Sequence, residues 1–151
     1  MRFCGTSSAL EFKRNYCLLF FMKTALIMTL SIFGLIITSY IIYAHARNKK
    51  VICPSFSKEC NAVLDSKWSR VLGVKNEIMG FIYYLIVFVF IGLSISSFRA
   101  VLVINALVII AVLYSLFLTY IQSKKLGHFC FYCICTAIIN LLLFFIIIVF
   151  N

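Results

Sequence analysis

The stretch that decides the fold is residues 129–150, which reads FCFYCICTAIINLLLFFIIIVF and contains no charged side chain. A bilayer core about 30 Å thick is crossed by about 20 apolar residues of an α-helix. This stretch is therefore predicted to span a membrane. It also carries a Cys-x-x-Cys motif, Cys130 and Cys133, at its beginning. The same segment thus combines a membrane helix with thiol chemistry.

Three further uncharged runs of similar length lie upstream, over residues 24–44, 78–98 and 100–122. The second, third and fourth runs are joined by short connections, which make neighbouring helices antiparallel. We therefore predict an all-α membrane protein in which residues 1–151 form one domain, an up-down four-transmembrane-helix bundle. The long connection is the loop over residues 45–77.

The composition excludes an ordinary soluble domain. The 151 residues are 64% hydrophobic, with 14 Lys or Arg and 4 Asp or Glu, whereas soluble domains are about 45–50% apolar and about 25% charged. Intrinsic disorder is excluded for the same reason. The net charge of +10 comes from basic residues that flank the apolar runs, as interfacial anchors do. No nucleic-acid partner is expected.

Within the loop, apolar side chains recur at helical spacing. They are Val63, Leu64, Trp68, Val71 and Leu72. This pattern predicts a short amphipathic helix that lies on the membrane surface or caps the bundle. The alternative is a solvated basic loop with one aromatic anchor.

Two pairs of cysteines are placed where they can react together. Cys53 and Cys60 lie in the loop, and counting membrane crossings puts them on the same face as Cys130 and Cys133. A cysteine at a helix N-terminus is favoured as thiolate by the exposed amides and the helix dipole. The loop pair can reach a water-soluble partner and the other pair a lipid-soluble acceptor, which suggests a relay by thiol–disulfide exchange. The bilayer-soluble acceptor of two electrons is a quinone, because no flavin, haem or nicotinamide motif is present.

Two other functions use the same cysteines differently. Four thiolates could hold zinc or copper(I), as in a metal-binding or transport membrane protein. The chain could also be a structural membrane subunit with incidental cysteines. Metal content and thiol-dependent quinone reduction separate these three readings.

The order of the motifs resembles a known family. Cys53-x6-Cys60 is followed by Asn61-Ala62-Val63-Leu64-Asp65-Ser66-Lys67-Trp68-Ser69, by Gly73, by Asn76 to Gly80 with Tyr83-Tyr84, and later by Cys130-Phe131-Tyr132-Cys133. This order resembles the vitamin K epoxide reductase family in its bacterial form. The DsbB family, another four-helix group of quinone-linked disulfide catalysts, carries its two cysteine pairs in the reverse order.

The resemblance implies a bundle that surrounds a quinone and assigns roles to the cysteines. Cys130 and Cys133 would be the redox centre, with Cys133 facing the quinone. Cys53 and Cys60 would be shuttle cysteines, with Cys60 exchanging with Cys130. Residues expected near the quinone are Ser66, Trp68, Phe129 and Tyr132. Vertebrate members have a tyrosine where this chain has Ala137, which makes vitamin K epoxide a doubtful natural substrate.

The expected function is a quinone-dependent thiol oxidase that supports disulfide-bond formation. It would pass electrons from a reduced periplasmic thioredoxin-fold (DsbA-like) protein to ubiquinone or menaquinone in the bacterial inner membrane. Nine basic residues lie on the cysteine-bearing face and five on the other, and this count alone would place the cysteines in the cytoplasm. We expect them in the periplasm, because a reducing cytosol would keep the relay thiols reduced.

Overall fold

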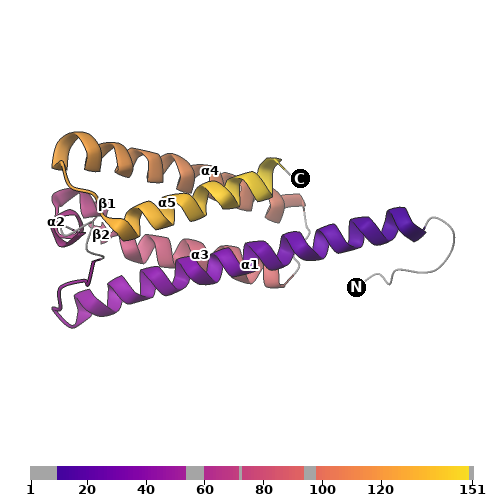
Figure 1. Ribbon diagram of the computed structural model, residues 1–151, viewed down its shortest axis with the longest axis horizontal. Helices are drawn as coiled ribbons and strands as arrows, with labels where there is room; N and C mark the ends of the chain where they lie inside the picture. Colours follow the sequence, from indigo (N-terminus) through magenta and orange to yellow (C-terminus); the bar gives the residue numbers. More distant parts are fainter. Residues whose placement is uncertain (1–9, 54–59, 72, 94–97, 150–151) are drawn as a thin grey trace.

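Four long helices lie side by side along the length of the molecule (Figure 1). The computed structural model describes residues 10–53, 60–71, 73–93 and 98–149. The helices are α1 (Leu10–Ala46), α3 (Asn76–Gly92), α4 (Phe98–Ile121) and α5 (Phe131–Phe144). A π-helical turn follows α4, η2 (Gln122–Leu126), and another follows α5, η3 (Phe145–Val149).

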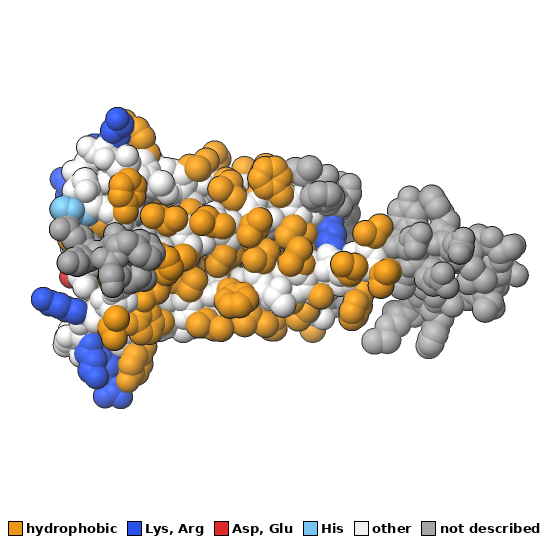
Figure 2. Space-filling model, in the orientation of Figure 1, with side chains coloured by type: hydrophobic (Ala, Val, Ile, Leu, Met, Phe, Trp, Pro, Cys, Tyr) orange, Lys and Arg blue, Asp and Glu red, His pale blue; other side chains and the backbone are white. Residues whose placement is uncertain are grey.

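The face of the bundle seen in Figure 2 carries hydrophobic side chains along most of its length. Large side chains such as Phe21, Ile110 and Leu113 are more than half exposed, which water would disfavour and lipid accepts. Within the described residues, three helical stretches are long and apolar enough to cross a membrane: Leu18–Ala46, Val101–Leu126 and Phe131–Ile148. The fourth long helix, α3, is apolar but has only 17 residues. The molecule is therefore a predominantly helical membrane protein.

The helix ends differ from the apolar runs for physical reasons. Helix α1 begins at Leu10 rather than near Thr24, because Lys and Arg end an apolar run but are good helix formers. Helix α3 ends at Gly92, before the predicted end at residue 98, and glycine weakens a helix by about 1 kcal/mol relative to alanine. Residues 94–97 of that run, Leu72 and Phe150 lie outside the described residues.

The connection between α1 and α3 forms a small cap at one end of the bundle (Figure 1). It contains α2 (Cys60–Leu64), the single turn η1 (Lys67–Ser69) and an antiparallel hairpin of β1 (Arg70–Val71) and β2 (Val74–Lys75). In place of one continuous amphipathic helix, this stretch thus forms α2, a 3-10 turn and the hairpin. Gly73, in the hairpin turn, has φ +82°, a conformation that favours glycine.

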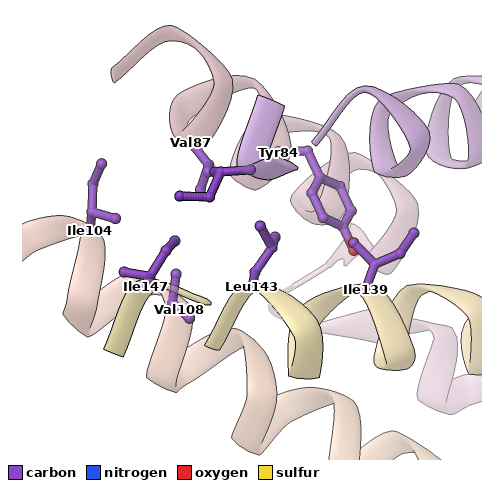
Figure 3. Packing of buried hydrophobic residues seen from close by; sticks show 8 residues of the cluster. Tyr84, Val87, Ile104, Val108, Ile139, Leu143 and Ile147 are labelled. Carbon is purple, nitrogen blue, oxygen red and sulfur yellow. The ribbon is translucent and has the colours of Figure 1, made fainter. Parts of the chain in front are cut away.

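The centre of the bundle joins α3, α4 and α5 through apolar packing and one polar network. The Tyr84 hydroxyl donates to Asn140 Oδ1 at 2.9 Å, and Asn140 Nδ2 donates to Ser115 Oγ at 2.7 Å. The buried side chains labelled in Figure 3 belong to the same core and are Tyr84, Val87, Ile104, Val108, Ile139, Leu143 and Ile147. Hydrogen bonds between helices hold a bundle together where lipid removes the hydrophobic driving force.

Helices α1 and α3 approach closely at one glycine. A Cβ atom built on Gly34 would lie 2.6 Å from ring atoms of Tyr84. Only a residue without a side chain allows this contact. Gly34 therefore sets the separation of the two helices near the middle of the bundle.

Candidate functional site

The loop cysteines are joined at the cap. Cys53 and Cys60 form a disulfide. The side chain of Asn61 holds the segment before Cys53 in place: the Val51 N–H donates to Asn61 Oδ1 at 2.8 Å, and Asn61 Nδ2 donates to the Val51 carbonyl at 3.2 Å. These paired hydrogen bonds bring the two cysteine-bearing segments together.

The same segment is also attached to the start of α5. The Tyr132 hydroxyl, within the Cys-x-x-Cys motif, donates to the Ile52 carbonyl at 2.6 Å. The Ile52 N–H donates to the Tyr40 hydroxyl at 3.1 Å, and the two tyrosine rings lie 5.6 Å apart. Two tyrosines thus hold the residue preceding Cys53 against the helix that carries Cys130 and Cys133.

All four sulfurs belong to one apolar cluster. Cys60 and Cys130 are completely buried in it, and Cys53 and Cys133 are partly buried against it. The cluster is completed by apolar side chains of α1, α2 and the segment after α1, among them Ile41, Val51 and Val63. The loop pair and the α5 pair are therefore neighbours in space although about 70 residues separate them in the sequence.

Cys130 is the N-cap residue of α5 and its surroundings favour the thiolate. Its backbone N–H donates to Oε1 of the buried Gln122 at 3.1 Å. Hydrogen bonding from the Cys133 thiol, together with the first-turn amides of Cys133 and Tyr132, lowers the pKa of Cys130 against the opposing effect of burial. Thiols at helix N-termini behave in this way.

A cavity of about 500 Å³ lies between the helices and the cap. Cys133 lines it and Cys130 does not. The wall is largely apolar in area, and the hydroxyl, amide and carboxyl side chains on it are Thr38, Ser66, Ser69, Asn76, Glu77, Tyr83, Tyr84, Tyr114, Ser115, Gln122, Tyr132, Thr136 and Asn140. An apolar pocket with a few polar groups is the usual form of a small-molecule site.

The predicted quinone-site residues have different positions relative to this cavity. Ser66, Trp68 and Tyr132 line it, whereas Phe129 is 47% exposed and does not. The Ser66 hydroxyl donates to the Val63 carbonyl at 2.7 Å, so it also fixes the end of α2. The Trp68 ring lies beneath Lys125 Nζ, 4.7 Å from the ring centroid.

Some of the other polar residues at the cavity were not singled out from the sequence. The Tyr114 hydroxyl donates to Asn76 Oδ1 at 2.6 Å, and Asn76 Nδ2 donates to the Trp68 carbonyl at 3.1 Å. Asn76 belonged to the motif that carried the resemblance, which was the available signal. Tyr114 lies inside an apolar run, and Gln122 was noted only as the end of that run. Neither could be recognised as a cavity residue before the packing of the helices was known.

The sequence model for the Vitamin K epoxide reductase family matches residues 25–148. The chain belongs to this family. No curated protein matches the chain. Membership makes it a quinone-linked disulfide oxidoreductase of a membrane, and the Cys53–Cys60 disulfide agrees with that chemistry.

Proposed function

We propose that the protein is a quinone-dependent thiol oxidase that supports disulfide-bond formation. The observation that carries this proposal is the position of its four sulfurs. Cys133 borders the cavity, while its neighbour Cys130 shares a buried cluster with Cys60 of the loop disulfide. One side of the redox centre thus faces a small-molecule site and the other faces the loop.

The first step is exchange with a thiol partner at Cys53. Cys53 is partly exposed and Cys60 is completely buried, so an incoming thiolate reaches the Cys53 sulfur. Attack there breaks the Cys53–Cys60 bond and releases the Cys60 thiolate into the cluster. The partner's second thiol then displaces Cys53, which leaves the partner oxidised and the loop pair as a dithiol.

The second step moves two electrons to α5. With Cys130 and Cys133 oxidised, the Cys60 thiolate attacks Cys130 and Cys133 leaves. Cys53 then attacks Cys60, reforms the loop disulfide and releases Cys130. The lowered pKa of Cys130 favours its departure, because a thiol of lower pKa leaves faster. The state with a loop disulfide and two α5 thiols is the product of this step.

The cavity fits a quinone ring in volume and lining. A volume of about 500 Å³ lies within the range of small-molecule sites, and Asn76 and Tyr114 are among the polar side chains on a largely apolar wall. A bound quinone would accept two electrons and two protons. Cys133 lies at the cavity wall, where its thiol can donate the electrons. Either ubiquinone or menaquinone meets these requirements.

The proposed membrane arrangement is four crossings of a bacterial inner membrane with the cap in the periplasm. Helix α3, with 17 residues, covers about 25 Å, slightly less than the 18-residue stretch Phe131–Ile148 of α5 and η3. Labelling intact spheroplasts with a membrane-impermeant thiol reagent after mild reduction should modify Cys53 or Cys60. Labelling only after lysis would overturn this orientation.

The direct test mixes purified protein, a reduced DsbA-like thioredoxin-fold protein and a soluble quinone, and follows quinol formation. We expect quinol to form at the rate at which the partner is oxidised. Absence of quinol with a folded enzyme would refute the proposal. Metal content measured on the same preparation tests the metal-binding alternative. That alternative requires four sulfurs, and the loop disulfide already uses two of them. Within the described residues, no three His, Cys, Asp or Glu side chains are grouped to hold a metal ion.

A further inference from the structure

A buried acid–histidine pair lies beside the cavity and has no part in the exchange steps above. Glu77, in the first turn of α3, is a lining residue whose side chain is only 3% exposed. Its Oε1 lies 2.7 Å from Nδ1 of His45, near the end of α1. Its other oxygen, Oε2, is buried and has no hydrogen-bond partner among the residues that the structure describes. Burying a polar oxygen without a hydrogen-bond partner destabilises the folded protein. The position of this carboxyl group therefore needs a physical reason.

The pair connects the cavity with the surface. His45 is 16% exposed in its side chain, and its second ring nitrogen, Nε2, lies 3.6 Å from Oδ1 of Asp65. The Asp65 side chain is 72% exposed. Three titratable groups from three segments therefore lead from water to the wall of the cavity. Histidine suits the middle position, because each ring nitrogen can take or give a proton near neutral pH.

Other charged or titratable groups are also close to Glu77. Lys75 Nζ lies 3.8 Å from Glu77 Oε1, and Cys133 is near enough for an electrostatic interaction with the carboxyl group. Tyr114 of α4 lines the same cavity. Among the described residues, His45 and Lys75 contact the carboxyl group and Asp65 contacts His45. Cys133 interacts with the carboxyl group electrostatically. The other titratable side chains that line the same cavity are Tyr83, Tyr84, Tyr114 and Tyr132.

We propose that Glu77 and His45 form a proton relay that serves Cys133 and the molecule reduced in the cavity. This inference rests on the proposed function. In the balanced step, Cys130 and Cys133 form one S–S bond, their two electrons pass to the bound quinone, and their two protons pass to its two oxygens. Glu77 holds one proton between its release from Cys133 and its transfer. His45 shares that proton and exchanges it with water beside Asp65.

A purely structural role would give a different outcome. A carboxylate in the first turn of a helix is stabilised by the helix dipole, and the contact between His45 and Glu77 also joins α1 to α3. A joint of that kind would affect folding but not the pH dependence of turnover. The two roles are therefore separated by pH profiles and by the titration of His45 itself.

The experiment uses the purified full chain and the variants Glu77→Gln and His45→Gln, with His128→Gln as the matched control. His128 is the other of two histidines, is exposed and does not line the cavity. Reduction of ubiquinone-1 by dithiothreitol is measured from pH 5 to 9. In the absence of quinone, the ring signals of the two histidines are titrated by NMR with Cys130 and Cys133 first reduced and then oxidised, and His128→Gln assigns them.

We expect Glu77→Gln to lower kcat about 100-fold with little change in KM, in the range found for positioned proton-transfer groups. His45→Gln should remove one limb of the pH profile, and His128→Gln should match the wild type. In the wild type, the NMR midpoint of His45 should move with the oxidation state of the cysteines and coincide with that limb. Reduction of the loop disulfide by dithiothreitol should be equally fast in all variants.

Unchanged kcat and pH profile in both relay variants would overturn the relay. An NMR titration midpoint of His45 that is the same with Cys130 and Cys133 reduced and oxidised would also overturn it. If Glu77→Gln fails to fold, His45→Gln and the NMR titration of the wild type still decide the matter. A wild-type protein that reduces no quinone would instead refute the proposed function. The NMR titration separates that failure from failure of the relay, because it requires no quinone.

Discussion

Replacing both loop cysteines should show which electron donor needs the loop pair and which can reduce the α5 pair directly. The loop pair is proposed to bring electrons from a folded protein to a redox centre that such a protein cannot reach. Without Cys53 and Cys60, the centre on α5 should remain chemically competent. A small membrane-permeant dithiol can reach Cys130 directly, whereas a thioredoxin-fold donor cannot. We expect Cys53→Ala with Cys60→Ala to lose activity with the protein donor and to keep a substantial fraction with dithiothreitol.

The variant should remain folded. The disulfide joins residues seven apart, and closing so short a loop stabilises the folded state by about 2.5 kcal/mol in the chain-entropy treatment. Cys60 is completely buried, so its replacement by the smaller alanine adds a packing loss of about 1 kcal/mol. The sum is below the 5–15 kcal/mol typical of folded domains. Asn61 and Tyr132 continue to hold the loop through their hydrogen bonds.

The assay measures quinone reduction with each donor at matched amounts of folded protein. Cys135→Ala is the control, because it removes a cysteine of α5 that the relay does not use. A metal site would lose two of four ligands and fail in any assay. A structural disulfide would affect both donors alike. Equal losses with the two donors would therefore refute the shuttle role of Cys53 and Cys60.

Four further substitutions test other parts of the protein. Cys130→Ser and Cys133→Ser should each abolish quinone reduction with every donor, because either change removes the α5 disulfide; appreciable turnover by Cys133→Ser would exclude it as the residue facing quinone. Tyr84→Phe should lower stability by about 1 kcal/mol, since it removes one hydrogen bond between helices, and thermal unfolding in detergent measures the change. Gln122→Met should destabilise by about 1–3 kcal/mol because it leaves the buried N–H of Cys130 unpaired, and a loss below 0.5 kcal/mol in denaturant titration would show that this hydrogen bond is unimportant.

Much of the general character of the protein was predictable from its sequence. Uncharged runs of about 20 residues can be stable only in lipid, and the family, the membrane character and the predominantly helical structure are confirmed. The cap was not predictable from spacing alone. Val63 and Leu64 follow the helical pattern into α2, but Asp65 and Ser66 favour helix ends and turns, because their side chains compete for backbone hydrogen bonds. The hairpin after them then replaces the rest of the predicted helix.

Site residues that lie in a local sequence motif could be predicted. Site residues that are brought together only by the packing of the helices could not. Cys130 and Cys133 are recognisable because two residues separate them at the start of an apolar run. His45 and Glu77 are 32 residues apart, and only the packing of α1 on α3 brings them together. Gln122 reaches Cys130 through the π-helical turn after α4. No pattern in the sequence predicts these contacts, because they depend on how the helices are rotated about their axes.

The glycine at position 34 gives the bundle a mechanical property. Gly34 and His45 lie on the same helix, about 16 Å apart along its axis, and α1 is held at the first point by Tyr84 and at the second by Glu77. Because an α-helix is stiff, a displacement of α1 at Gly34 also moves the end that carries His45. A methyl group at Gly34 would push α1 away from α3 and tilt its far end, so a change deep in the hydrocarbon region would be felt at the acid–histidine pair near the water boundary. A substitution at Gly34 is therefore expected to disturb the proposed proton relay without touching a sulfur atom.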